Sequence, residues 1–207
     1  MPGIKVLRGR LSQAAGADPR VRRSRAALTT AFTELAFERG YQDIGVRDVA
    51  DRAAVGRSTL YSHFSDMNDL LAHSLDTHLG TLARCTVRLE MEPDLVRVIA
   101  HFWQQRSSAR TMLQGQAGAA IACLLVRHLE TALLGLYRTH RSRPSLPASL
   151  LAEQLAAGQI AVLATWLAGR AAASPEKVAQ LLHRTSYAAA MASLQSVESA
   201  RLSKTGR

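Results

Sequence analysis

The chain has 207 residues, of which 47% are hydrophobic and 20% are charged, a composition typical of a globular protein with one or two domains. The formal net charge of +10 favours a polyanionic partner, either nucleic acid or an anionic membrane surface. The sequence shows no apolar run of about 18 residues and no signal-peptide core in residues 1–20, which predicts a cytoplasmic protein without a membrane partner.

Positive charge gathers at the beginning of the chain. Seven of the 26 Lys and Arg residues fall within residues 1–25, where Asp18 is the one acidic residue. Residues 1–19 also lack apolar periodicity. This segment is therefore predicted to be a flexible basic arm that can neutralise phosphates.

A helical period in the apolar residues begins after the arm. The first predicted helix starts at Pro19 and ends at Arg39-Gly40, where glycine supplies a stop signal. A second short helix follows the link at residues 41–44, and a tight turn at residues 54–56 leads into a third helix from Arg57 to Phe64. The apolar faces of the first two helices are Leu28, Phe32, Leu35 and Ala36, and then Val46, Val49, Ala50 and Ala53.

The rest of the chain is also predicted to be helical. Ser65-Asp66 caps a longer helix, a short helix falls within residues 107–118, and an apolar stripe runs from residue 121 to residue 137. Two strong helices finish the chain, at about residues 148–171 and 175–200, with Ser174 as the cap and Pro175 in the first turn of the last one. No strand alternation is found, so the predicted fold class is all-α.

The stretch of residues 55–64, VGRSTLYSHF, offers few core anchors for a helix. Two short helices joined by a tight turn and covered by a preceding helix form a helix-turn-helix unit, whose second helix enters the DNA major groove. Arginine can pair with guanine, and hydroxyl groups donate to bases or phosphates. A solvated surface helix would show the same polar positions. The residues of this helix predicted to contact DNA are Arg57, Ser58, Thr59, Tyr61, Ser62 and His63.

Residues 22–71 resemble the DNA-binding domain of the TetR family of transcriptional repressors. The motifs that carry the resemblance are Phe32-Thr33-Glu34-Leu35-Ala36 with Gly40-Tyr41, then Val46-Arg47-Asp48-Val49-Ala50, then Thr59-Leu60-Tyr61-Ser62-His63-Phe64, and Asp69-Leu70-Leu71. The resemblance implies an N-terminal three-helix helix-turn-helix DNA-binding domain at residues 20–65. It implies a helical effector-binding and dimerisation domain at residues 66–207.

Four positions depart from the family pattern. Gly45 and Gly56 replace the usual hydroxyl caps of the second and third helices, Ala54 replaces the usual turn glycine, and Met67 replaces the usual lysine of the fourth helix. The basic arm is expected to take over part of the lost phosphate neutralisation. The positions outside the third helix that are expected to meet DNA are Arg22, Arg23, Arg25, Gly45, Arg47 and Gly56.

The resemblance also implies a homodimer and a small-molecule effector. The faces predicted for the partner, unless they serve as ordinary core within one chain, are Leu151, Leu155, Gly158, Val162 and Trp166, with Ala188, Ala189 and Ala192 on the last helix. The residues predicted to bind a small, largely apolar effector are His78, Phe102, Trp103, Met112, His128 and Tyr137. His78 and His128 lie within apolar stripes and could equally be satisfied core histidines, whereas His101 is expected to be solvated.

Competing functions have less support in the sequence. No catalytic motif and no ligand-spaced metal cluster is present, so neither an enzyme nor a cofactor is predicted, and Cys85 and Cys123 are expected to be free thiols. The predicted function is a ligand-responsive regulator, acting as a repressor, that binds an inverted-repeat operator as a homodimer and is released by a small molecule. The alternative is a constitutive or non-specific DNA-binding protein without an effector.

Overall fold

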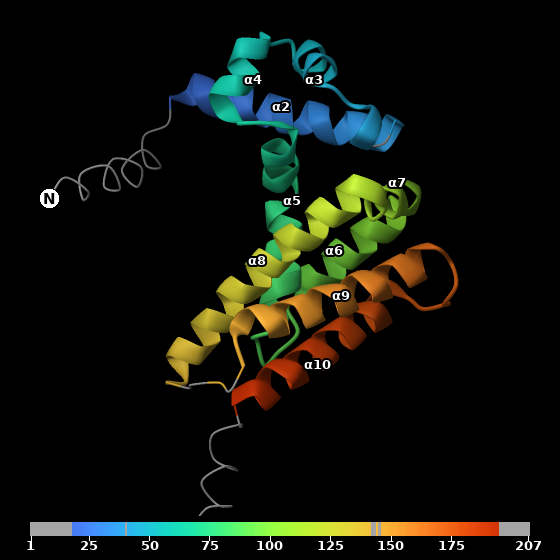
Figure 1. The fold of residues 1–207 in the computed structure, drawn as a ribbon. Coiled ribbons are helices and arrows are strands. Elements are labelled where there is room, and N and C mark those ends of the chain that lie inside the picture. Colours follow the sequence, from blue (N-terminus) through green and yellow to red (C-terminus); the bar gives the residue numbers. More distant parts are fainter. Residues whose placement is uncertain (1–17, 40, 142–143, 145, 195–207) are drawn as a thin grey trace, which may run out of the picture. The chain divides into compact units, whose positions relative to one another are not determined.

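The computed structural model describes residues 18–39, 41–141, 144 and 146–194 (Figure 1). Within these ranges the ordered elements are nine α-helices and one 3-10 turn, which confirms the all-α expectation. The chain divides into two compact units, Met1–Arg39 with Asp43–Ser74, and Gly40–Gln42 with Leu75–Arg207, so that the division falls within helix α5 (Met67–Arg84). Most of the predicted basic arm, residues 1–17, lies outside the described residues.

The first unit is built on a long helix, α2 (Pro19–Arg39), against which two short helices pack, α3 (Val46–Arg52) and α4 (Arg57–His63). A 3-10 turn at Tyr41–Asp43 follows α2. Most of the predicted apolar positions form the core, because each of these side chains is at most 3% exposed: Leu28, Phe32, Leu35, Ala36, Val49, Ala50, Leu60 and Phe64. Val46 and Ala53, which were also predicted on the buried face, are half-buried.

The turn between α3 and α4 places Ala54 in the left-handed region, with φ 52°. Val55 N donates to Ala50 O (3.0 Å) and Ala54 N donates to Asp51 O (3.2 Å). These two bonds form a Schellman motif, in which the left-handed residue is usually glycine. An L-residue with a Cβ in this region costs about 1–2 kcal/mol, so this turn carries strain at Ala54.

We expect Ala54→Gly to raise the free energy of unfolding by about 0.5–1 kcal/mol, because glycine relieves the left-handed strain but has more backbone entropy to lose. Chemical denaturation followed by circular dichroism measures the change. The matched control is Ala53→Gly, since Ala53 has a right-handed backbone with φ −79° and should lose stability by a similar amount. A loss of stability in both variants would contradict the expectation.

Ion pairs join α3 to α2 at the surface. Arg52 contacts both carboxylate oxygens of Glu38 (2.9 and 2.7 Å) and one oxygen of Glu34 (3.4 Å). The hydrogen bond from Arg52 lowers the pKa of Glu38 below its ordinary value. Because these groups are exposed to solvent, the pairs fix the position of α3 more than they stabilise the fold.

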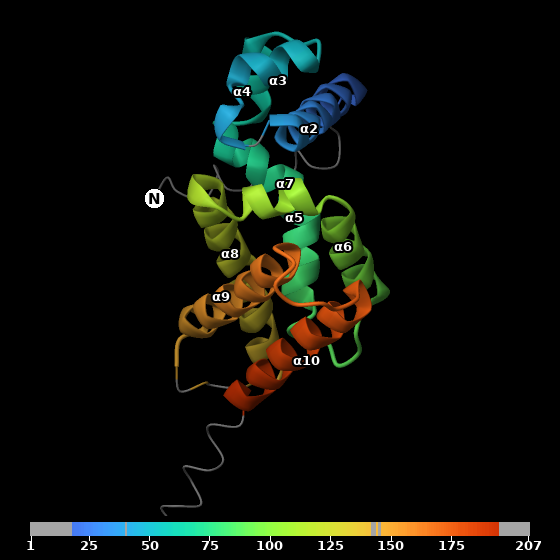
Figure 2. The same ribbon diagram turned by 90° about the vertical axis from the view of Figure 1, so that its right-hand side faces the viewer.

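The second unit contains the rest of α5 and five further helices. They are α6 (Pro93–Gln104), α7 (Arg106–Met112), α8 (Gly115–Thr139), α9 (Ala148–Leu167) and α10 (Pro175–Leu194). Helix α8 packs along α9, and α10 packs against α6 and α9 (Figure 2). The buried stripe of α8 follows the helical period and consists of Ile121, Leu125, Leu129, Leu133 and Leu136.

Local hydrogen bonds explain where several helices begin and end. Asp66 Oδ1 accepts from Asp69 N (2.8 Å) and Ser174 Oγ accepts from Lys177 N (3.4 Å), which confirms both predicted caps. Helix α9 ends at Leu167, before the predicted residue 171, because Gly169 (φ 74°) closes it with a left-handed turn. The end predicted for the last helix, near residue 200, lies outside the described residues.

Two of these helices are long and apolar enough to cross a membrane by length and composition alone, namely α8 and α9. The prediction of no apolar run of about 18 residues used a stricter criterion, since both helices contain charged residues. The apolar face of α8 is buried in the core of the second unit and α8 packs along α9. Since the core helices of soluble proteins pass the same test, this finding is weak evidence for a membrane span.

The two cysteines lie in different surroundings. Cys85 is 1% exposed and its thiol donates to Leu82 O (3.0 Å), whereas Cys123 is exposed on α8. Burial raises the pKa of Cys85 to about 12. Both thiols are free, as expected.

Candidate functional site

Helix α4 presents polar side chains to solvent while its apolar side is buried. Leu60 is fully buried, whereas Arg57, Ser58, Tyr61 and Ser62 are exposed. Tyr61 is 58% exposed, which is costly for an aromatic ring unless a partner covers it. The structure therefore places four of the six residues predicted on this helix on one accessible surface, and Thr59 is half-buried beside them.

His63 has a partner within the unit that the sequence did not indicate. Its Nε2 lies 2.7 Å from Ser24 Oγ on α2. Partial burial, and then the positive charge of Arg25, lower the pKa of His63 below its ordinary value. The neutral ring thus fixes the end of α4 to α2, and its role is partly structural.

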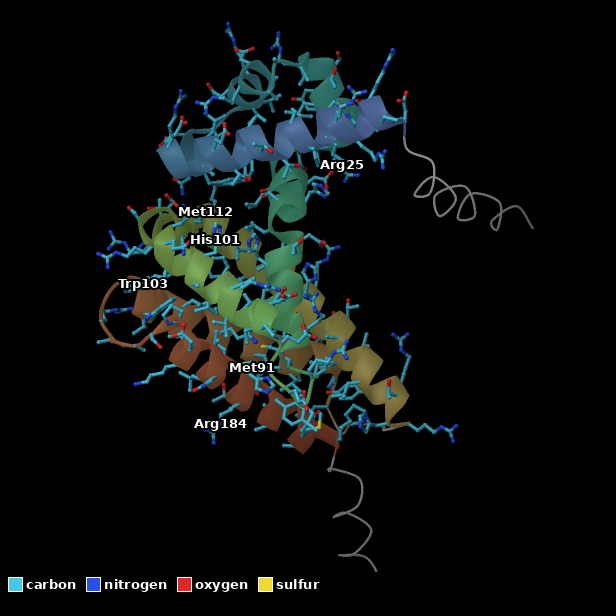
Figure 3. The ribbon with its side chains drawn as sticks, turned by 180° about the vertical axis from the view of Figure 1, so that it is seen from behind. Arg25, Met91, His101, Trp103, Met112 and Arg184 are labelled. Carbon is cyan, nitrogen blue, oxygen red and sulfur yellow. The ribbon has the colours of Figure 1, made fainter. Side chains whose placement is uncertain are left out.

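Arginines at the start of α2 surround this contact. Arg22, Arg23 and Arg25 are exposed, and the Arg25 guanidinium lies 5.3 Å from the centre of the buried Phe64 ring. Figure 3 labels Arg25 on α2. In the part of the chain that the structure describes, these three arginines and Arg57 form no salt bridge. Their charges are therefore available for phosphates.

The remaining predicted contacts lie at the beginnings of α3 and α4. Gly45 is exposed and its N–H donates to Asp48 Oδ2 (2.9 Å), which is the half of a capping box that needs no side chain at the first position. Gly56 is exposed and provides no side-chain cap for α4. Arg47 lies 3.6 Å from Asp51, and both side chains are more than 70% exposed, which makes the pair weak.

Two of the predicted effector residues meet in the second unit. The His78 ring of α5 lies 5.8 Å from the Phe102 ring of α6 and stacks on His101, with centroids 5.5 Å apart and 19° between the planes. The expectation that His101 is solvated was therefore wrong, because its ring packs against α5. Burial, and then the neighbouring His101, lower the pKa of His78.

The other predicted effector residues lie in different surroundings. Trp103 stacks on Trp166 of α9 (4.6 Å), and Met112 is half-buried on α7; Figure 3 labels Trp103 and Met112. His128 lies 3.4 Å from Asp76. The structure thus brings His78 and Phe102 together and gives Trp103 and His128 other partners.

Tyr137 lies near the end of α8, where its hydroxyl is 3.1 Å from Ser193 Oγ. It lines a pocket of about 140 Å³ whose walls are mostly apolar. The other residues that line this pocket are Pro144, Leu146, Pro147, Leu150, Leu151, Gln154 and Ser193. Of the six residues predicted to bind an effector, this pocket includes Tyr137 alone.

Comparisons with known proteins agree with the helix-turn-helix geometry. The family model of the bacterial regulatory proteins of the tetR family matches residues 28–73. The transcriptional activator FasR of Mycolicibacterium smegmatis is 39% identical over 58 residues, which are 28% of this chain and 26% of FasR. An uncharacterised helix-turn-helix regulator of Haemophilus influenzae is 35% identical over 64 residues, 31% of each chain. The chain thus covers less than a third of the length of either relative.

Two solved structures share the overall fold. A TetR transcriptional regulator from Streptococcus agalactiae has a TM-score of 0.52 and 23% identity, over 81% of this chain and 95% of that one. The dihydroxyacetone kinase operon activator DhaS has a TM-score of 0.51 and 16% identity, over 80% and 94% of the two chains. At these identities the likeness shows the fold alone.

Proposed function

Since the chain belongs to the TetR family of bacterial transcriptional regulators through residues 28–73, we propose that it is a cytoplasmic, ligand-responsive repressor that binds an inverted-repeat operator as a homodimer. The observation that carries the proposal is the exposed polar surface of α4 beside Arg22, Arg23 and Arg25 of α2, which form no salt bridge with any residue that the structure describes. A helix of this kind reads base edges, while the arginines hold phosphates.

The proposed direction of regulation is repression, relieved when a small, largely apolar effector binds the second unit. FasR, which shares part of the first unit, is named an activator, so the first unit alone does not decide the direction. A reporter gene fused to the DNA upstream of this protein's own gene decides it. Deleting the regulator should raise expression of the reporter if it is a repressor.

The proposed dimer uses the outer faces of α9 and α10. Leu150 is 57% exposed and Leu181 is 48% exposed, and the same helices expose small residues, Ala157, Gly158 and Ala161 on α9 and Ala188 and Ala192 on α10, with the polar Glu153, Gln154, Arg184 and Thr185 between them. Apolar and small side chains gathered on an accessible surface are typical of an interface. Leu155 and Trp166 are 7% and 2% exposed within one chain, so they belong to its own core instead.

We expect Arg57→Ala to weaken operator binding by about 1–3 kcal/mol and to relax the preference at one base of each half-site, because a bidentate arginine–guanine pair would be lost. Fluorescence anisotropy with the upstream DNA and with random DNA of the same length measures both effects. The matched control is Arg110→Ala, which removes the same charge from the exposed surface of α7 and should change neither affinity.

The same experiment separates the proposal from its alternative, a non-specific DNA-binding protein. Such a protein would bind upstream and random DNA equally, because it recognises phosphates alone. Equal affinities in the wild type would therefore contradict the proposed operator. If the wild type prefers the upstream DNA and Arg57→Ala leaves that preference unchanged, another residue of α4 must recognise the bases.

A further inference from the structure

A buried glutamine in the second unit has only half of its amide satisfied. Gln159 on α9 is 2% exposed, and its Nε2 donates to Ser186 Oγ of α10 (3.0 Å) and approaches Leu82 O of α5 (3.5 Å). Within the part of the chain that the structure describes, Gln159 Oε1 accepts no hydrogen bond. A buried amide oxygen without a donor is rare in folded proteins and calls for a specific partner.

The orientation of the Gln159 amide identifies its unpaired atom as the oxygen, which accepts hydrogen bonds. Leu82 O is a carbonyl oxygen and can only accept, so the amide must turn its NH₂ group toward it. Rotating the amide by half a turn would place two acceptors against each other. Gln159 Oε1 is therefore the atom left open to a donor from a water or another bound molecule.

A second unpaired atom lies one helical turn earlier on α5. His78 precedes Leu82 by four residues, a rise of about 6 Å along the same helix face. Its Nδ1 is buried and has no hydrogen-bond partner among the described residues, while its ring packs against His101 and Phe102. The His78 and Leu82 side chains thus lie on the same face of α5, and the Gln159 amide approaches the backbone carbonyl of Leu82.

The charges near this face disfavour an anionic ligand. Arg84, the nearest basic residue in sequence after Leu82, already donates to Thr81 Oγ1 (2.9 Å) and to Glu92 (3.3 Å). The pKa of His78 is lowered by burial, which keeps its ring neutral near pH 7. A buried carboxylate would therefore find no free cation along these residues, and its burial would be costly.

We propose that this face of α5 binds an uncharged molecule with an apolar body and a hydroxyl group, which donates its hydrogen bond to Gln159 Oε1. The neutral His78 Nδ1 is a second polar contact one turn away. That this molecule acts as the effector rests on the proposed function, whereas its binding does not. Because α5 contributes residues to both units, a ligand held against Leu82 and His78 touches the helix that the units share.

The first test uses the wild-type protein and three matched sets of probes. Phenol, 4-ethylphenol and 2-naphthol are each compared with their methyl ether, which lacks the donor, and with the carboxylate of the same ring. Calorimetry and thermal denaturation measure binding. We expect at least one phenol to bind about tenfold or more tightly than its ether, and we expect the carboxylates to bind least.

The second test locates the donor contact. Gln159→Leu and Gln159→Met remove the acceptor, and Gln180→Leu, an exposed position on α10, is the control. The preference for phenol over ether should disappear in both Gln159 variants and persist in the control. Absence of binding by all three phenols, equal binding of the ethers or carboxylates, or a preference that survives at Gln159 would overturn the proposal.

The comparison of phenols with their ethers and carboxylates in the wild type tests the proposed site even if a Gln159 variant fails to fold. Operator binding is measured separately, with and without the phenol that binds best. A phenol that binds through Gln159 but leaves operator affinity unchanged would contradict the effector role and support the site. Failure to bind the operator without any ligand would contradict the proposed function alone.

Discussion

Replacing Phe64 with alanine is expected to lower the free energy of unfolding by about 3–5 kcal/mol, the usual cost of truncating a buried aromatic side chain. Phe64 is 1% exposed, and its ring lies 5.5 Å from His73 and beneath the Arg25 guanidinium. Its backbone N–H also closes α4 through Leu60 O (2.9 Å). Loss of the ring removes the anchor that holds the end of α4 in the first unit.

The measurement is chemical denaturation of the two proteins, with far-ultraviolet circular dichroism as the signal. Tyr61→Ala is the matched control, because it removes an aromatic ring from the exposed side of the same helix. We expect it to change stability by less than about 0.5 kcal/mol while it weakens operator binding. Equal destabilisation by the two substitutions would show that Phe64 is not the anchor of α4.

A second large effect is expected at the proposed dimer face. Ala188→Glu combined with Ala192→Glu should convert the protein to monomers or make it insoluble, because each carboxylate buried in an interface without a partner costs several kcal/mol, as an order-of-magnitude estimate. Both alanines are exposed within one chain, so the first effect should be on association rather than on the fold. Operator affinity should fall with the loss of the dimer, since one recognition helix then replaces two.

Sedimentation velocity measures the association state, and circular dichroism checks that the helices persist. The control carries the same two charges at other exposed alanines, Ala119→Glu on α8 with Ala171→Glu after α9, and should sediment as the wild type does. An intact dimer in the α10 double variant would place the interface on another surface.

The features of this fold that depend on neighbouring residues were predictable from the sequence. The helical spacing of apolar residues predicted α2, α3 and α4. Helix α4 ends at His63, one residue before its predicted end. The caps at Asp66 and Ser174 depend on residues three positions apart. Such patterns are readable because the backbone geometry of a helix fixes which neighbours meet.

Contacts between distant residues could not be read in this way. Ser24 and His63 are 39 positions apart, and nothing in either segment indicates their bond. The His78–His101 and Trp103–Trp166 stacks depend likewise on the angles at which helices pack, which sequence periods do not determine.

The predicted dimer stripe on α9 shows a related limit. An apolar period marks one buried side of a helix, and on α9 that side is used within the chain by Leu155 and Trp166. The exposed side carries Ala157, Gly158 and Ala161, which are too small to give a strong apolar signal. The apolar period of such a helix therefore reveals only the side that is buried within the chain.

The different surroundings of the two cysteines make this chain suitable for selective chemical labelling. Thiolates are the reactive species toward maleimides, and Cys85 is both buried and held protonated by its raised pKa. Cys123 is exposed on α8. A maleimide dye is therefore expected to attach at one position per chain without any engineered cysteine. In the proposed symmetric dimer the two dyes would report a single distance, which could be followed as upstream DNA or a candidate ligand is added.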